Sequence, residues 1–287
     1  MSKKRTDLLI IDPQIDFCRP GQDENDPKRG ALYVDNAEND MVRVSDLIKR
    51  YGEKIKKIHV TLDCHHRFDI AHPGFWRNSD GKHPDFFTII SHQDVVDAVW
   101  SPVFMKLPGH PDESAVEYLK RYTKTLEDGK RYPLCIWPPH CLIGSEGNAV
   151  FPVLFEALRI WEEEKRNNNV EFVSKGSTIT TEHYSAIKAE VPDPEDPTTQ
   201  INTRFIKALK DADEVLICGE AGSHCVKNTV EDIADGFNDD EAIKKMVLLT
   251  DGISPVQSPV VDFPAIQTQF ITDMKNRNMR TAETTDF

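Results

Sequence analysis

Short apolar runs alternate with helix-like stretches along most of the chain, and this alternation constrains the fold more than any other feature of the sequence. Short runs that are apolar throughout are typical of strands buried on both faces of a parallel sheet. The expected strands are residues 8–11, 55–62, 170–173, 214–218 and 246–249. The expected helices are residues 37–51, 150–166, 203–212, 224–236 and 263–277. We therefore predict an α/β fold in three layers, with a mainly parallel sheet and helices on both faces.

One segment, from about residue 75 to 134, does not follow this alternation. It is rich in Pro, His, Asp and Gly, and it has one expected helix at 112–126. We interpret it as a long insertion within a single domain spanning residues 1–287, and a lid and a subunit contact are both open roles for it. A second irregular segment, 191–199, is rich in Pro and Asp and is expected to be a surface loop.

The charge of the chain restricts the partners to expect. The formal net charge of -13 over 287 residues disfavours binding to nucleic acid or to an anionic membrane. The sequence has no apolar run of about 18 residues, and its N-terminus lacks the features of a signal peptide. The 6 cysteines form no C-x-x-C pair, so they are expected to be thiols in a reducing compartment. We expect a cytoplasmic protein with a small-molecule partner, and a homo-oligomer is left open.

Polar residues follow the predicted strands where each strand ends. Asp12 follows the first strand, Asp63 the second, Lys175 the third and the segment 219–225 the fourth. In open parallel sheets, ligands and catalytic groups lie at the carboxyl ends of the strands. These side chains are therefore expected to meet at one edge of the sheet.

Cys225 is the candidate nucleophile of this edge. It lies at the predicted start of a helix, where unpaired N–H groups and the helix dipole favour a thiolate and can hold an oxyanion. From position alone, a cysteine that only packs on the sheet is equally compatible. His224 is the neighbouring residue, but adjacent helical side chains do not face each other. A base from another strand is therefore preferred.

Asp12 and Lys175 are the candidates for that base and its partner. A carboxylate beside a thiol can accept its proton, and an ammonium group keeps the carboxylate ionised and stabilises the thiolate. Separately, Asp12 could be a turn cap and Lys175 a solvated surface lysine. Together with Cys225 they form a candidate triad.

A carboxylate and several imidazoles form a candidate metal site. Asp63 and His65 lie two residues apart, so they point to the same side of an extended segment, and His72 follows them. His140 comes from the proline-rich run Trp137-Pro138-Pro139-His140. Such donors suit zinc, manganese or iron. The alternative is a polar loop without an ion.

Three sequence blocks resemble the isochorismatase-like cysteine hydrolases, a family that includes the nicotinamidases. They are Leu8–Phe17 with its Asp12, Lys175-Gly176, and Gly219-Glu220-Ala221-Gly222-Ser223-His224-Cys225-Val226. The resemblance implies an isochorismatase-like fold with Asp12, Lys175 and Cys225 as catalytic residues. It also implies a cis peptide at Glu220–Ala221 and an oxyanion hole from the backbone N–H groups of Ala221 and Cys225. The family usually has Thr-Asp where this chain has Gly222-Ser223.

Two further blocks are similar to nicotinamidases in particular, namely Asp63-x-His65 and Trp137–Cys141. They imply one divalent metal ion, zinc before iron or manganese, that binds the pyridine nitrogen of nicotinamide. The implied ligands are Asp63, His65, His140 and His72, with Phe17 and Trp137 against the substrate ring. The implied reaction is hydrolysis of nicotinamide to nicotinate and ammonia, a step of NAD salvage.

Three other functions stay open at this stage. The first is the same cysteine chemistry on another small amide or ureido compound. The second is a metallohydrolase in which metal-bound water attacks and Cys225 only packs. The third is a binding protein without catalytic activity.

Overall fold

The computed structural model describes residues 4–258 and 261–287, and its centre is a six-stranded sheet. The strand order is β10-β9-β8-β1-β2-β7, and every neighbouring pair is parallel. The strands are β1 (Thr6–Ile11), β2 (Ile55–Asp63), β7 (Glu171–Lys175), β8 (Glu214–Gly219), β9 (Met246–Leu249) and β10 (Arg280–Ala282). This architecture confirms the predicted α/β fold with a parallel sheet.

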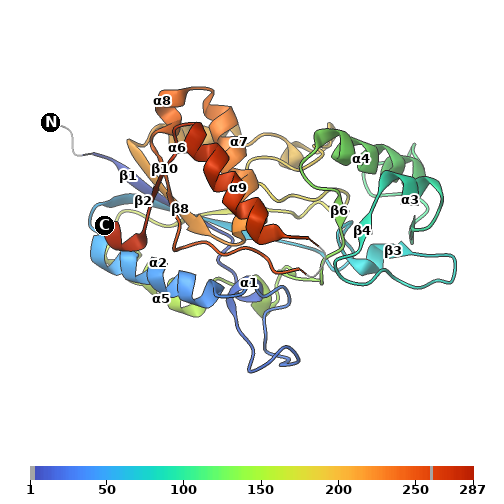
Figure 1. The fold of residues 1–287 in the computed structure, drawn as a ribbon, viewed down its shortest axis with the longest axis horizontal. Coiled ribbons are helices and arrows are strands. Elements are labelled where there is room, and N and C mark those ends of the chain that lie inside the picture. The colour runs from blue at the N-terminus through green and yellow to red at the C-terminus, as the bar shows by residue number, and fades with distance from the viewer. Residues whose placement is uncertain (1–3, 259–260) are drawn as a thin grey trace.

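Helices cover both faces of this sheet (Figure 1). On one face lie α2 (Ala37–Tyr51) and α5 (Pro152–Lys165), which pack on each other. On the other lie α6 (Thr203–Lys210), α7 (Lys227–Phe237) and α9 (Phe263–Asn276), with the short α8 (Asp240–Ile243) after α7. The central strands β1 and β8 are buried along their whole length, which explains why their sequences are apolar throughout rather than alternating.

The segment around Cys225 differs from the prediction. The regular helix α7 begins at Lys227, three residues later than residue 224, and a π-helical turn, Gly222–Val226, precedes it. Cys225 therefore lies in this turn and not in the first turn of an α-helix. The short helix α1 (Ile15–Cys18) follows β1 at the same edge of the sheet.

The segment expected as an insertion has helices and strands of its own and lies to one side of the sheet (Figure 1). Its elements are β3 (Trp76–Arg77), β4 (Ile89–Ile90), α3 (His92–Val96), β5 (Ser101–Pro102), α4 (Ala115–Gly129) and β6 (Leu134–Cys135). β3 pairs with β5 and β4 with β6, both antiparallel. Its apolar side chains form a second hydrophobic cluster around Trp76 and Tyr122, separate from the main core. That the chain is one domain with an insertion stays a prediction.

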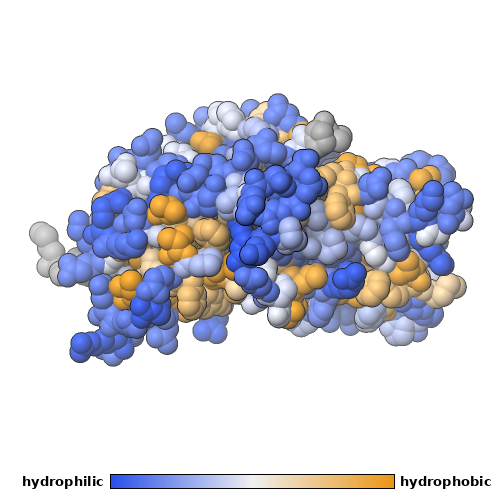
Figure 2. Space-filling model, turned by 90° about the horizontal axis from the view of Figure 1, so that it is seen from below, coloured by the Kyte–Doolittle hydropathy of each residue, from blue (hydrophilic) through white to orange (hydrophobic). Residues whose placement is uncertain are grey.

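On one face of the molecule, the apolar area is scattered rather than continuous (Figure 2). On the face shown in Figure 2, hydrophobic residues lie in separate patches among hydrophilic ones. Exposed apolar side chains include Phe68, Met105 and Phe172. In the part of the chain that the structure describes, no helix has the length and apolar character needed to cross a membrane.

Candidate active site

The carboxyl ends of β1 and β7 and the turn after β8 bring Asp12, Lys175 and Cys225 together. The Lys175 ammonium lies 2.9 Å from Asp12 Oδ2 and 3.6 Å from Cys225 Sγ. The same Nζ atom donates at 2.9 Å to Asp63 Oδ1 and at 2.9 Å to the carbonyl oxygen of His183. All three side chains are buried. The lysine therefore links the predicted triad to the predicted metal site.

The Asp12 carboxylate is fixed by Thr61 of β2. The Thr61 hydroxyl accepts from the Asp12 backbone N–H at 3.0 Å and donates to Asp12 Oδ1 at 2.5 Å. Asp12 adopts a left-handed backbone conformation with φ 44°, which turns the chain away from β1 at this residue. Its Oδ2 atom makes the ion pair with Lys175 but accepts no aligned hydrogen bond from a described residue. This oxygen is therefore able to accept a proton.

The Cys225 thiol is protonated in this environment. Burial raises the pKa of Cys225 well above its usual range; Asp12 raises it further, and Lys175 lowers it. The lowering of the thiol pKa expected from a helix start is not found, because desolvation of a buried thiolate outweighs the single nearby cation. Burial likewise raises the pKa of Asp12, against the influence of Lys175. Activation of the thiol thus requires transfer of its proton to a base.

The turn that carries Cys225 also presents a free donor to the site. The Glu220–Ala221 peptide bond is cis, as expected. The Ala221 N–H donates to no described residue, although Ala221 is buried and lines the cavity beside Cys225. An unpaired buried N–H is costly unless a ligand uses it. This N–H is one of the two donors predicted for the oxyanion.

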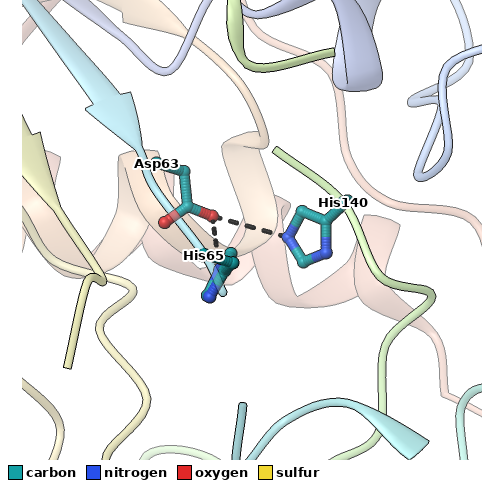
Figure 3. A group of neighbouring side chains, drawn as sticks. All are labelled: Asp63, His65 and His140. Atoms are coloured by element: carbon teal, nitrogen blue, oxygen red, sulfur yellow. Dashed lines mark hydrogen bonds and ion pairs between the residues drawn. The ribbon is translucent and has the colours of Figure 1, made fainter. Parts of the chain in front are cut away.

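Asp63, His65 and His140 form a buried group that could hold a metal ion. Their side chains converge from β2 and from the loop after β6 (Figure 3). Asp63 Oδ2 lies 2.9 Å from His65 Nε2 and 3.4 Å from His140 Nε2. Two donors that bind one zinc ion at tetrahedral angles lie about 3.4 Å apart. The spacing of the three donors therefore fits a single ion.

The imidazoles are oriented in the same way, each through its Nδ1 atom. Nδ1 of His65 lies 3.1 Å from Asp69 Oδ2, and Nδ1 of His140 lies 2.8 Å from the Pro138 carbonyl oxygen. A partner at Nδ1 places the proton there and leaves Nε2 as the ligand atom. His72 has a similar arrangement, with Nδ1 3.1 Å from the His66 carbonyl oxygen and a buried Nε2 without a partner among the described residues.

His72 lies beside the group of Asp63, His65 and His140 but is not one of its three members. Its ring centroid lies 5.1 Å from that of His65 and 5.5 Å from that of His140. Burial lowers the pKa of His72 to about 2, so its ring is neutral and its Nε2 can act as a donor to a metal. The structure thus brings together all four predicted ligands, with His72 at the periphery.

A small cavity of about 340 Å³, part of it open to solvent, joins the thiol to this group. Its walls include Phe17, Trp137, Tyr184 and His224, and Cys225, Asp63 and His140 also face it. The Phe17 and His140 rings contact edge to face at 5.4 Å, and Trp137 Nε1 donates to the Tyr184 hydroxyl at 3.1 Å. The aromatic rings in the walls of the cavity suit a flat molecule.

Sequence reasoning missed several residues of this site. Glu182 lines the cavity with a buried Oε2 that has no partner among the described residues, and burial raises the pKa of Glu182 to about 7. Gln14 holds Asp63 by exchanging hydrogen bonds of 2.7 Å with its backbone N–H and carbonyl. Glu182 lies in an irregular segment without periodicity, so no pattern indicated it. Gln14 belongs to the sequence block Leu8–Phe17, but nothing in that block indicated a role for it.

His224 is part of the cavity wall and not a base for Cys225. Its Nδ1 lies 2.9 Å from Ser223 Oγ, and its ring stacks on Tyr132 at 4.7 Å. Burial lowers the pKa of His224 to about 3, so the imidazole is neutral. This agrees with the preference for a base from another strand.

Comparison with solved structures shows which proteins share this fold. A nicotinamidase/pyrazinamidase from Acinetobacter baumanii matches with a TM-score of 0.61 at 17% identity, over 100% of this chain and 99% of that one. The yeast nicotinamidase matches with a TM-score of 0.61 at 22% identity, over 97% and 99%. A Pyrococcus horikoshii pyrazinamidase in complex with zinc matches with a TM-score of 0.52 at 17% identity, over 97% and 99%.

Comparison with protein-family models and with curated protein sequences gives no match. The structural similarity extends over nearly the full length of this chain and of each of these proteins. At these identities it establishes the fold. The chain therefore has the isochorismatase-like α/β fold of the nicotinamidases and pyrazinamidases.

Proposed function

We propose that this protein is a cytoplasmic nicotinamidase, which hydrolyses nicotinamide to nicotinate and ammonia through a thioester on Cys225. One observation carries the proposal: the Lys175 ammonium lies within 3.6 Å of Cys225 Sγ and 2.9 Å from Asp12 Oδ2. Cys225 lines the same small cavity as Asp63 and His140. The nicotinamidase fold supports the assignment.

Each step of the reaction uses a group of this site. Asp12 Oδ2 accepts the thiol proton, and the sulfur attacks the amide carbon. The N–H groups of Ala221 and Cys225 donate to the oxyanion, and Lys175 stabilises the charge on Asp12 and on the sulfur. Asp12 then returns the proton to the departing nitrogen, so that ammonia leaves and the thioester remains. Water hydrolyses the thioester, which releases nicotinate and the thiol.

Asp63, His65 and His140 would hold one divalent metal ion, zinc before iron or manganese, with His72 as a fourth ligand. The bound metal would supply a Lewis acid for the pyridine nitrogen of the substrate. Phe17 and Trp137 would lie against the ring and align the amide with Cys225. Zinc bound to the Pyrococcus horikoshii pyrazinamidase supports this choice of metal.

Ammonia release from nicotinamide, measured before and after removal of metal by a chelator, tests the proposal. We expect turnover that falls on chelation and returns when zinc is added. Benzamide has the same shape without the ring nitrogen, so it should be a poor substrate whose turnover is indifferent to the chelator. Absence of ammonia release by the zinc-loaded protein would exclude nicotinamide as the substrate.

The alternative is the same chemistry on another small amide or ureido compound. Glu182 favours it, because its buried carboxyl oxygen in the cavity has no partner and could bind a donor that nicotinamide lacks. A panel of small amides and ureido compounds in the same ammonia assay distinguishes the two. A higher kcat/KM for a compound with an additional N–H or O–H group, lost in Glu182→Gln, would support the alternative.

A further inference from the structure

Two buried carboxyl groups lie behind the turn that carries Cys225. Glu220 directly precedes Ala221, and Asp40 comes from α2; their exposed fractions are 0% and 1%. Ser254 joins them: its backbone N–H donates to Glu220 Oε2 at 3.2 Å, and its hydroxyl donates to Asp40 Oδ2 at 2.6 Å. Ser254 therefore bridges the two carboxyl groups. None of these groups lines the cavity.

The donors and charges around this pair favour one proton on it. Asp40 Oδ1 accepts from the Arg43 guanidinium and, at 3.1 Å, from the Asn36 side-chain amide. Glu220 has no cation of its own, and its Oε1 is buried without a donor among the described residues. Two ionised carboxylates on one serine repel each other, and one guanidinium compensates one negative charge. The pairing of Arg43 with Asp40 points to Asp40 as the carboxylate and to Glu220 as the acid.

We propose that neutral Glu220 donates its proton to Asp40, and that this pair is a positioning device for the turn bearing Ala221 and Cys225. It rests on the proposed function, in which that turn supplies the nucleophile and the oxyanion donor. The pair acts through the loop of Ser254, whose backbone is bonded to the turn at several points.

These bonds connect the two segments on both sides of Glu220. Gly219 N–H donates to the Gly252 carbonyl at 2.9 Å, and Gly222 N–H donates to the Ser254 carbonyl at 2.7 Å. The Val256 N–H donates to Ser223 Oγ at 3.1 Å, and Val256 lines the cavity. Ionisation of Glu220 would place a second negative charge against Asp40 and would separate the Ser254 loop from the turn.

The charge of the pair depends on pH, and the surrounding groups determine whether the pKa of Glu220 is raised or lowered. Burial raises the pKa of Glu220 well above its usual range, and the Asp40 carboxylate raises it further. The other titratable groups around the pair are Arg43 on α2, Cys18 on α1, Cys218 on β8 and Asp251 after β9. Burial also raises the pKa of both thiols well above their usual range, so they do not titrate at neutral pH.

Glu220→Gln tests the proton, because a glutamine keeps a donor toward Asp40 and an acceptor for the Ser254 N–H but cannot ionise. A folded-state pKa above the unfolded value means that wild-type stability falls as pH rises from about 4.3, the usual glutamate pKa, toward the folded-state value. The difference in Tm between Glu220→Gln and wild type should therefore grow by several degrees between pH 5 and 9. Glu214→Gln is the matched control and should show no such growth, because Glu214 is a buried carboxylate at the opposite end of β8 that is paired with Lys4 and Arg280.

Activity tests the positioning role. Glu220→Ala leaves Asp40 and the Ser254 N–H without their partner, so kcat for ammonia release should fall roughly tenfold with KM within about twofold. Glu220→Gln should retain kcat at pH 7 and keep it at alkaline pH where wild type loses it. A KM effect as large as the kcat effect, or the same alkaline loss in wild type and Glu220→Gln, would overturn the positioning role.

The two proposals fail in distinguishable ways. If no amide is hydrolysed, the Tm series still tests the shared proton, and the alkylation rate of Cys225 by iodoacetamide tests the turn. The proposal for the Glu220–Asp40 pair would then be supported, without the proposed function, by two results. The Tm difference between Glu220→Gln and wild type would grow with pH, and alkylation of Cys225 would be slower in Glu220→Ala. Parallel Tm profiles of wild type and Glu220→Gln would refute the pair, whether or not ammonia is released.

Discussion

Asp12 and Lys175 act on the Cys225 thiol in opposite directions, so their replacement should have opposite effects on its reactivity. Asp12 raises the pKa of Cys225 and Lys175 lowers it. Asp12→Asn should therefore speed alkylation of Cys225 by iodoacetamide at pH 7, and Lys175→Ala should slow it, while both lose most turnover. In wild type the raised pKa means that alkylation accelerates as pH increases from 7 to 9. Rates from peptide mapping decide this, and slower alkylation in Asp12→Asn would contradict it.

Cys225 itself should be indispensable for turnover and dispensable for folding. Its side chain is small, and the turn around it is held by backbone bonds such as that from Gly222 to Ser254. Cys225→Ala should retain its Tm within a few degrees and still bind nicotinamide, with kcat below about a thousandth of wild type. Calorimetric binding and ammonia release measure the two properties. Steady turnover above that level would rule out covalent catalysis.

His65 and His140 should govern substrate affinity and not thiol reactivity. Each presents Nε2 to Asp63 and neither contacts Cys225 through a hydrogen bond among the described residues. His65→Ala and His140→Ala should lose stoichiometric metal and weaken nicotinamide binding about tenfold or more, with little change in the alkylation rate of Cys225. His66→Ala, an exposed neighbour, is the control. Full metal content in both variants would show that these residues are not ligands.

At the scale of elements, regular segments were predictable and irregular ones were not. The range of α2 was predicted to the residue and β9 likewise, because apolar periodicity follows from burial. β10 was not predicted, since a partly exposed edge strand of three residues, Arg280–Ala282, has no apolar run. The meeting of Asp12, Lys175 and Cys225 followed from the rule of strand ends, whereas Glu182 depends on a loop path that no local pattern encodes.

The second hydrophobic cluster should support the loop that carries His72, a proposed metal ligand. Trp76 is fully buried there, and its Nε1 donates at 2.7 Å to the carbonyl of Ile70, two residues before His72. Trp76→Ala should cost about 3–5 kcal/mol, and should lower metal content and raise KM at temperatures where far-UV circular dichroism is still native. Trp161→Ala, a buried tryptophan in the main core, should lower Tm without this separate loss of metal. Equal behaviour of the two variants would show that the cluster has no special link to the site.

At the scale of the whole molecule, the pKa values of buried carboxyl groups are shifted differently at the two edges of the sheet. At the amino ends of the strands, burial alone would raise the pKa of Glu214, but Lys4 and Arg280 outweigh it and lower the pKa. The pKa of Asp7 is also lowered, with His59 and Arg5 outweighing burial. At the carboxyl ends, burial raises the pKa of Asp12, Glu182 and Glu220. The carboxyl ends are mixed, however, because His65 and Lys175 outweigh burial at Asp63 and lower its pKa well below its usual range.

Carboxyl groups with a lowered pKa and those with a raised pKa have opposite effects on how stability depends on pH. Groups with a lowered pKa stabilise the fold above their unfolded values, and this contribution is lost as pH falls through the folded-state values. Tm should therefore fall below about pH 4, and the acid limb should be shallower in Glu214→Gln than in wild type. Thermal unfolding followed by circular dichroism from pH 7 to 3 measures both. An unchanged acid limb in that variant would refute a contribution from this ion pair.

Lys175 has three N–H bonds to give and four acceptors around it: Asp12, Asp63, the His183 carbonyl and the sulfur of Cys225. At any time one of these acceptors therefore has no hydrogen bond from Lys175. In the proposed reaction, the acceptor without that bond changes. Once Asp12 holds the thiol proton, it attracts the ammonium less, and the anionic sulfur accepts the hydrogen bond instead. When the proton goes to the leaving nitrogen, the balance reverses. Lys175 thus redistributes its hydrogen bonds among these acceptors during the proposed reaction, while its own position and charge stay constant.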